Sequence, residues 1–130
     1  MEYPHISYEL NKLSNEIIGL AIKVHNALGP GLLESSYKEC LFYEILKAGY
    51  MAEKEKALPL IYKEVKLDIG YRMDILVEDK LVVEIKAVDA LAEIHTAQVL
   101  TYLKLSGKRL GLLLNFNVKY LKSGIRRLVF

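Results

Sequence analysis

Two apolar runs joined by a short polar segment dominate the middle of the chain, in Tyr71-Arg72-Met73-Asp74-Ile75-Leu76-Val77-Glu78-Asp79-Lys80-Leu81-Val82-Val83-Glu84-Ile85-Lys86-Ala87. Such a pattern predicts a β-hairpin. Asp74, Glu84 and Lys86 nevertheless lie inside runs that should be buried. Removing carboxylates and an ammonium group from water is costly unless they are paired or bind something. The hairpin is therefore a candidate site for a metal ion and water.

The register of this hairpin decides whether its charged side chains meet. Side chains alternate between the two faces of a strand, and directly paired residues share a face. A two-residue turn at Asp79-Lys80 would put Asp74 and Glu84 on opposite faces. A three-residue loop, Glu78-Asp79-Lys80, would put Asp74, Glu84 and Lys86 on one face. We predict this loop, or a bulge of equivalent effect.

Length and composition restrict the class of protein. The 130 residues suit one domain, residues 1–130, with a real core. The apolar content is 52%, but no uninterrupted apolar run approaches the roughly 20 residues that cross a bilayer. The N-terminal Met1-Glu2-Tyr3-Pro4-His5 does not resemble a signal peptide. The single cysteine, Cys40, excludes an intrachain disulfide and a multi-cysteine zinc site. We expect a soluble, cytoplasmic protein without a membrane segment.

Charge is distributed unevenly along the chain. Residues 1–93 contain 11 Lys and Arg against 16 Asp and Glu. Residues 94–130 contain no acidic residue and seven basic ones, Lys104, Lys108, Arg109, Lys119, Lys122, Arg126 and Arg127. A basic segment of this kind suits a polyanion such as nucleic acid. The alternative is a solvated face that offsets acidic residues elsewhere.

The spacing of apolar residues predicts the order of the elements. Three- and four-residue steps predict helices over 8–28, about 32–47 and about 93–105. Strands are predicted over 57–62, 65–69, the two arms of the hairpin and 109–116, and 125–130 is predicted as a last strand or short helix. The order, roughly ααββββαβ(β), predicts an α/β domain with a central mixed β-sheet flanked by helices.

The charged residues of the hairpin suit one kind of chemistry. Two adjacent carboxylates repel, and a divalent cation such as Mg²⁺ or Mn²⁺ removes that penalty. A lysine on the same face, such as Lys86, would orient a water molecule or neutralise charge developing on a phosphate. These residue types suit metal-assisted phosphodiester hydrolysis, and a structural ion-pair network is the alternative. A second Glu-x-Lys, Glu64-Val65-Lys66, is interpreted as a solvated turn.

Two helical segments carry further candidates. Gln98 and Tyr102 lie four residues apart and share a helix face, which His95 joins. This stripe either lies beside the carboxylates or faces solvent. The opposite side carries Ala97, Leu100 and Leu103. Glu34 lies near the start of the second helix, where the helix dipole favours a carboxylate. Tyr37, one turn later, is either a core residue or orients Glu34.

Four elements of the sequence together resemble the GxxExxY proteins, a branch of the PD-(D/E)xK nuclease superfamily: Gly31-x-x-Glu34-x-x-Tyr37, Asp74, Glu84-x-Lys86 and Gln98-x-x-x-Tyr102. The resemblance extends to Val24-His25-Asn26-Ala27-Leu28-Gly29-Pro30-Gly31, Leu114-Asn115-Phe116 and Gly124-Ile125-Arg126-Arg127, and so covers nearly the whole chain.

This resemblance implies a restriction-endonuclease-like fold with an αβββαβ core and a Mg²⁺ site. Carried over to this chain, the metal ligands are Asp74, Glu84 and Glu34, and the catalytic lysine is Lys86. Gln98 and Tyr102 resemble the Gln-x-x-x-Tyr element of the RecB-like exonucleases, which contacts the substrate or supports the site. The implied activity is Mg²⁺-dependent cleavage of nucleic acid, with DNA favoured over RNA. The alternative is a binding module that keeps the nuclease fold without turnover.

The sequence alone does not decide the roles of four other residues. Arg72 either pairs with an acid or meets a phosphate, and Arg126 either contacts phosphate or is solvated. His25 and Asn115 are expected to have mainly structural roles. Because one small domain must reach two strands to break a duplex, a homodimer is a further hypothesis.

Overall fold

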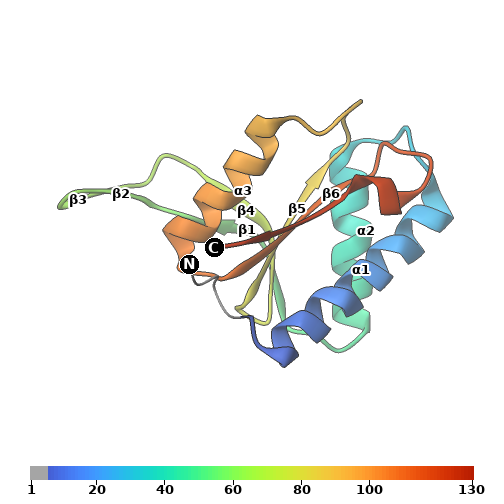
Figure 1. Ribbon diagram of the computed structural model, residues 1–130, viewed down its shortest axis with the longest axis horizontal. Helices are drawn as coiled ribbons and strands as arrows, with labels where there is room; N and C mark the ends of the chain where they lie inside the picture. Colours follow the sequence, from blue (N-terminus) through green and yellow to red (C-terminus); the bar gives the residue numbers. More distant parts are fainter. Residues whose placement is uncertain (1–5) are drawn as a thin grey trace.

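A five-stranded mixed β-sheet, in the order β1-β4-β5-β6-β7, forms the centre of the molecule in the computed structural model, which describes residues 6–130 (Figure 1). The strands are β1 (Ala52–Ala57), β4 (Arg72–Val77), β5 (Leu81–Lys86), β6 (Leu110–Asn115) and β7 (Ile125–Val129). The β5–β6 pair is parallel, and the other neighbouring pairs are antiparallel. The predicted α/β class with a central mixed sheet is confirmed. Residues 1–5, on which the expectation about a signal peptide rests, lie outside the described residues.

Helices cover both faces of the sheet. The helices α1 (Tyr8–Leu28) and α2 (Glu34–Lys47) lie on one face, and α3 (Glu93–Ser106) lies on the other (Figure 1). Each face has its own apolar core. On β5 the alternation of side chains supplies both, since Val83 packs toward α1 and α2 whereas Val82 packs toward α3. Strand β5 therefore lies between the two cores, with α1 and α2 on one face and α3 on the other.

The first helix shows why the periodic pattern predicts its bounds well. Its N-cap, Ser7, accepts a hydrogen bond from the backbone N–H of Leu10 at 3.1 Å. Its apolar stripe is buried against the sheet and α2. Gly29 ends the helix with a φ of 67°, a left-handed conformation that glycine adopts without strain. The predicted helices over 8–28 and 93–105 are confirmed, and α2 begins at Glu34 rather than at about Leu32.

The strand prediction between residues 52 and 69 was incomplete, because it gave two strands where the structure has three. The edge strand β1 was missed because its sequence, Ala-Glu-Lys-Glu-Lys-Ala, has no apolar alternation and its side chains are mostly exposed. The strand predicted over 57–62 is the short β2 (Leu60–Tyr62), and that over 65–69 is β3 (Val65–Leu67). These two strands form a separate two-stranded sheet, an arm that projects from the body (Figure 1).

The C-terminal segment closes the sheet on the far side from β1. The buried strand predicted over 109–116 is β6, and the last element is the strand β7 rather than a helix. A short 3₁₀ helix, η1 (Leu121–Gly124), turns the chain between them. None of the helices in residues 6–130 is both long and apolar enough to cross a membrane.

Gly124 permits a close approach between η1 and the end of β6. A Cβ atom at this position would overlap the backbone carbonyl oxygen of Asn115. We expect Gly124→Ala to lower the free energy of unfolding by about 3 kcal/mol, because a clash with backbone is relieved only by moving a strand. Urea denaturation measures the effect. In the control Gly19→Ala, on the exposed side of α1, the new Cβ meets no atom within 4 Å. That change should raise stability by about 0.5–1 kcal/mol, so equal effects of the two substitutions would contradict the prediction.

Candidate active site

The hairpin has the register that brings its carboxylates together. Ile75 pairs with Val83 and Val77 with Leu81, which leaves Glu78-Asp79-Lys80 as a three-residue loop. Glu78 and Asp79 both have a positive φ, near 55°, as short hairpin loops commonly require. The predicted loop is confirmed, and Asp74 and Glu84 therefore lie opposite each other.

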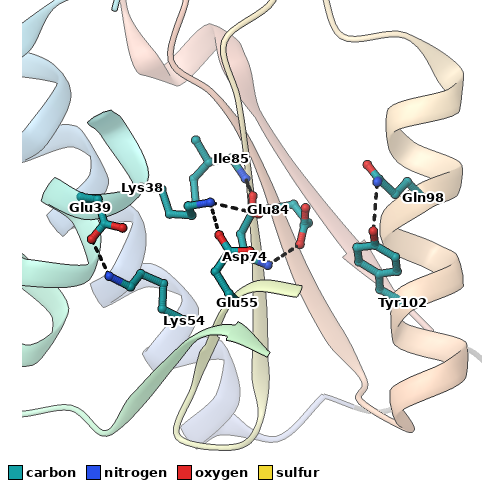
Figure 2. Close-up of polar contacts among 9 residues, drawn as sticks. All are labelled: Lys38, Glu39, Lys54, Glu55, Asp74, Glu84, Ile85, Gln98 and Tyr102. Atoms are coloured by element: carbon teal, nitrogen blue, oxygen red, sulfur yellow. Dashed lines mark hydrogen bonds and ion pairs between the residues drawn. The ribbon is translucent and has the colours of Figure 1, made fainter. Parts of the chain in front are cut away.

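The backbone ladder between β4 and β5 stops at Ile75 and Val83, and the two carboxylates continue it. Glu84 Oε1 accepts the backbone N–H of Asp74 at 2.8 Å. In return, Asp74 Oδ2 accepts the backbone N–H of Ile85 at 2.9 Å (Figure 2). These reciprocal bonds hold the carboxylates where the strands separate. Asp74 Oδ1 and Glu84 Oε2 take no part in these two bonds, and Asp74 Oδ1 lies 3.9 Å from Lys38 Nζ.

Burying the carboxylates of Asp74 and Glu84 side by side costs electrostatic free energy. Burial raises the pKa of Glu84 to about 9, and the negative charge of Asp74 adds to the increase. Burial likewise raises the pKa of Asp74, although the hydrogen bond from Ile85 and the charge of Lys38 oppose this. Glu84 is only 2% exposed, so water compensates little of the cost. A cation bound between the carboxylates would remove the penalty.

Two residues that the sequence analysis missed, Lys38 and Glu55, join this cluster. Lys38 Nζ lies 3.9 Å from Asp74 Oδ1 and also pairs with the Glu55 carboxylate (Figure 2). Burial lowers the pKa of Lys38, but the hydrogen bond to Glu55 and the charge of Asp74 outweigh it and raise the pKa. Lys38 lies one helical turn after Glu34, so the shared helix face was a signal for it. Glu55 had none, because its strand was not predicted.

Glu34 and Lys86 lie within electrostatic reach of each other and of the pair. Burial raises the pKa of Glu34, Lys86 opposes this most strongly, and Asp74 adds to it. Lys86 also acts on Glu84, as expected for residues of one strand that share a face. The structure therefore gathers the four predicted catalytic residues, Glu34, Asp74, Glu84 and Lys86, in one neighbourhood.

Tyr37 supports the loop that precedes Glu34. It is fully buried and stacks on Phe116 with ring centroids 4.6 Å apart. Its hydroxyl donates to the carbonyl of Gly29 at 2.6 Å and accepts from the N–H of Leu32 at 3.1 Å. Tyr37 is therefore a core residue, the first of the two alternatives, and its hydroxyl bonds the loop that precedes α2. Its burial rules out direct contact with a substrate.

Removing the Tyr37 hydroxyl should therefore weaken the fold. We expect Tyr37→Phe to lower the free energy of unfolding by about 1–2 kcal/mol, because the Gly29 carbonyl and the Leu32 N–H lose the hydroxyl that they share as a hydrogen-bond partner. Thermal and urea denaturation measure the loss. Tyr43→Phe, at an exposed position of the same helix, is the control and should change little. Equal stability of Tyr37→Phe and the unaltered chain would contradict this role.

The stripe on α3 faces the site rather than solvent. Tyr102 is buried, and Gln98 Nε2 donates to its hydroxyl at 3.0 Å (Figure 2). Burial and the charge of Glu84 raise the pKa of Tyr102, which places its ring beside the acidic pair. His95 has a different role, because its Nδ1 accepts the backbone N–H of Ala92 and caps the helix. Ala97, expected on the packed side, is exposed.

Three of the four remaining candidates bond other parts of the fold. Arg72 is exposed, and no acid in residues 6–130 pairs with it. Arg126 donates to Thr96 Oγ1 at 2.8 Å and to the Leu91 carbonyl, which joins β7 to the start of α3. His25 Nε2 bonds the Val118 carbonyl at 2.8 Å. The side chain of Asn115 both donates to and accepts from the backbone of Val88. The structural roles expected for His25 and Asn115 are confirmed.

The donor set fits a hard divalent cation. One oxygen each of Asp74 and Glu84 lies outside the two backbone bonds. The surroundings hold four acids (Asp74, Glu84, Glu34 and Glu55) and two lysines (Lys38 and Lys86), and Lys38 pairs with Glu55 and Asp74. Within residues 6–130, no three His, Cys, Asp or Glu side chains gather into a ready-made metal cage. Mg²⁺ does not need one, because it commonly binds through one or two carboxylates and keeps several waters.

Comparison with known families agrees with this geometry. A family model described as the PD-(D/E)XK nuclease superfamily matches residues 11–128. The chain belongs to this superfamily. Members of the PD-(D/E)XK superfamily are generally hydrolytic nucleases and typically use divalent metals, so nucleic acid is the substrate class that membership implies. Neither the curated proteins nor the solved structures compared with this chain gave a match.

Proposed function

We propose that this protein is a Mg²⁺-dependent nuclease of the GxxExxY branch that hydrolyses phosphodiester bonds, with DNA favoured over RNA. The observation that carries the proposal is the buried Asp74–Glu84 pair, whose reciprocal backbone bonds leave one oxygen of each carboxylate for a ligand. Burial raises the pKa of both acids, and a bound cation would offset that cost. Membership of the PD-(D/E)XK superfamily supports the same reaction.

The proposed roles follow from charge and position. Asp74 and Glu84 would hold Mg²⁺ or Mn²⁺, with Glu34 acting on a metal-bound or attacking water. The ion would supply Lewis acidity that polarises the phosphodiester and eases deprotonation of water. Lys86, on the face of Glu84, would orient the attacking water and neutralise charge that develops on the phosphate.

We propose that Gln98 and Tyr102 hold the substrate strand beside the acids. Their location on α3, where Gln98 bonds Tyr102 and Tyr102 senses the charge of Glu84, supports this role. Phosphates further along would meet lysines of the basic C-terminal third. Lys104, Lys119 and Lys122 are exposed there and pair with no acid of residues 6–130. Arg72 remains a candidate phosphate contact, whereas Arg126 would first have to leave Thr96.

A metal titration with labelled single-stranded, duplex and branched DNA, and with RNA, tests the proposal. Cleavage should require Mg²⁺ or Mn²⁺, stop on addition of EDTA and disappear in Asp74→Asn. Binding of nucleic acid without cleavage under every metal would instead identify a binding module that keeps the fold.

We also propose a homodimer, because cutting both strands of a duplex needs two sites. The mass in solution, measured by light scattering, decides that point.

A further inference from the structure

A cavity of about 240 Å³ lies between α3 and the base of the β2–β3 arm. Leu60 of β2 and Tyr71, just before β4, form one side of it. The other side is a stripe along α3 that includes Ile94, Gln98 and Tyr102. Ile94 is 71% exposed and Tyr71 is 44% exposed, so the cavity opens to solvent and is accessible to a ligand.

Tyr102 connects this cavity to the acidic pair. Its ring lines the cavity, while the nearby charge of Glu84, together with burial, raises the pKa of its hydroxyl. Tyr71, which also lines the cavity, contributes weakly to the raised pKa of the same hydroxyl. Tyr102 therefore belongs both to the wall of the cavity and to the surroundings of Glu84, one of the residues proposed to hold the scissile phosphodiester.

The lining selects a flat, uncharged ligand. The two tyrosines and the aliphatic Leu60 and Ile94 form apolar walls, and no charged side chain of the described residues lines the cavity. A phosphate needs cationic or N–H donors and would gain little here. A nucleobase fits better, because every base has a π-face that stacks on tyrosine and polar edges that an amide such as Gln98 pairs with.

We propose that this cavity binds one unpaired nucleobase of the substrate, next to the phosphodiester held at Asp74 and Glu84. The proposal rests on the proposed nuclease function and names the substrate form. A base within a duplex is stacked and paired, and extruding it costs a few kcal/mol. Single strands, frayed ends and unpaired flaps are therefore the preferred substrates.

A binding measurement tests the cavity without any catalysis. Single-stranded DNA that contains the fluorescent base 2-aminopurine is titrated with the protein in EDTA, where no metal-dependent cleavage occurs. We expect quenching by tyrosine stacking, an affinity about tenfold lower for Tyr71→Ala, and near-normal affinity for Tyr71→Phe. The control Tyr62→Ala removes an exposed ring of the arm that does not line the cavity. Absence of quenching, or equal losses in Tyr71→Ala and Tyr62→Ala, would overturn the proposal.

A second measurement separates this proposal from the nuclease function. Single-stranded DNA that carries an abasic residue is cut by the unaltered protein with Mg²⁺. We expect the phosphates that flank the abasic residue to be cut about tenfold more slowly than the same phosphates in the intact strand, and Tyr71→Ala to remove this difference. Equal cutting of both strands would refute the base site and leave the nuclease intact. Quenching without any cleavage would support the base site and refute the nuclease.

Discussion

Lys86→Ala is expected to lower the rate of phosphodiester cleavage by about 10²–10³-fold while metal binding is retained. The reason is charge, since Lys86 faces Glu34 and Glu84 and would stabilise negative charge only as it develops on the phosphate. Its removal also takes a competing cation away from the carboxylates. Mn²⁺ affinity measured by calorimetry should therefore be unchanged or higher, whereas Asp74→Asn should lose both metal binding and cleavage.

A matched control for Lys86 exists within the chain. Lys66 belongs to the second Glu-x-Lys, Glu64-Val65-Lys66, which lies on the exposed arm away from the acidic pair. Lys66→Ala should leave cleavage unchanged. If Lys86→Ala cuts at the rate of Lys66→Ala, or if its urea midpoint falls enough to explain the loss, the catalytic role of Lys86 is wrong.

The second large effect concerns stability and pH. Glu84 has a pKa of about 9 in the folded protein, because of burial and the charge of Asp74, against an ordinary value of 4.5. Between these values the folded chain keeps a proton that the unfolded chain releases. The free energy of unfolding therefore falls as pH rises from 4.5 to 9, by roughly 1 kcal/mol per pH unit for one proton. Without metal, stability should be highest in mildly acidic solution.

Glu84→Gln should remove most of this dependence. The amide keeps an oxygen for the backbone N–H of Asp74 but has no proton to lose, so above pH 7 the variant should be more stable than the unaltered chain by several kcal/mol. Urea denaturation in EDTA from pH 5 to 8.5 measures both profiles, with the exposed Glu64→Gln as control. Added Mg²⁺ should restore stability at high pH in the unaltered chain and not in Glu84→Gln. Parallel profiles would show that Glu84 is not the titrating group.

Local patterns in the sequence were sufficient for much of the fold. The helix over 8–28 and the buried strand near 109–116 have strong periodic or continuous apolar signals, and the structure follows them closely. The register of β4 and β5 also followed from the sequence, because a three-residue loop puts both carboxylates on one face whereas a two-residue turn does not. Weak local signals failed, as at β1, where an exposed edge strand of charged residues is held by pairing with β4 rather than by its own composition.

Sequence alone determined which residue types are available for the chemistry: two carboxylates and a lysine in a hairpin, an acid at a helix start, and a Gln-x-x-x-Tyr stripe. Tertiary structure decided how they are used. It inserted Lys38 and Glu55 beside Asp74, gave each carboxylate a backbone partner, and buried Tyr37 beneath the loop before Glu34. The physical reason is that burial and charge proximity depend on residues far apart in the chain, and these set the pKa values that a local pattern does not contain.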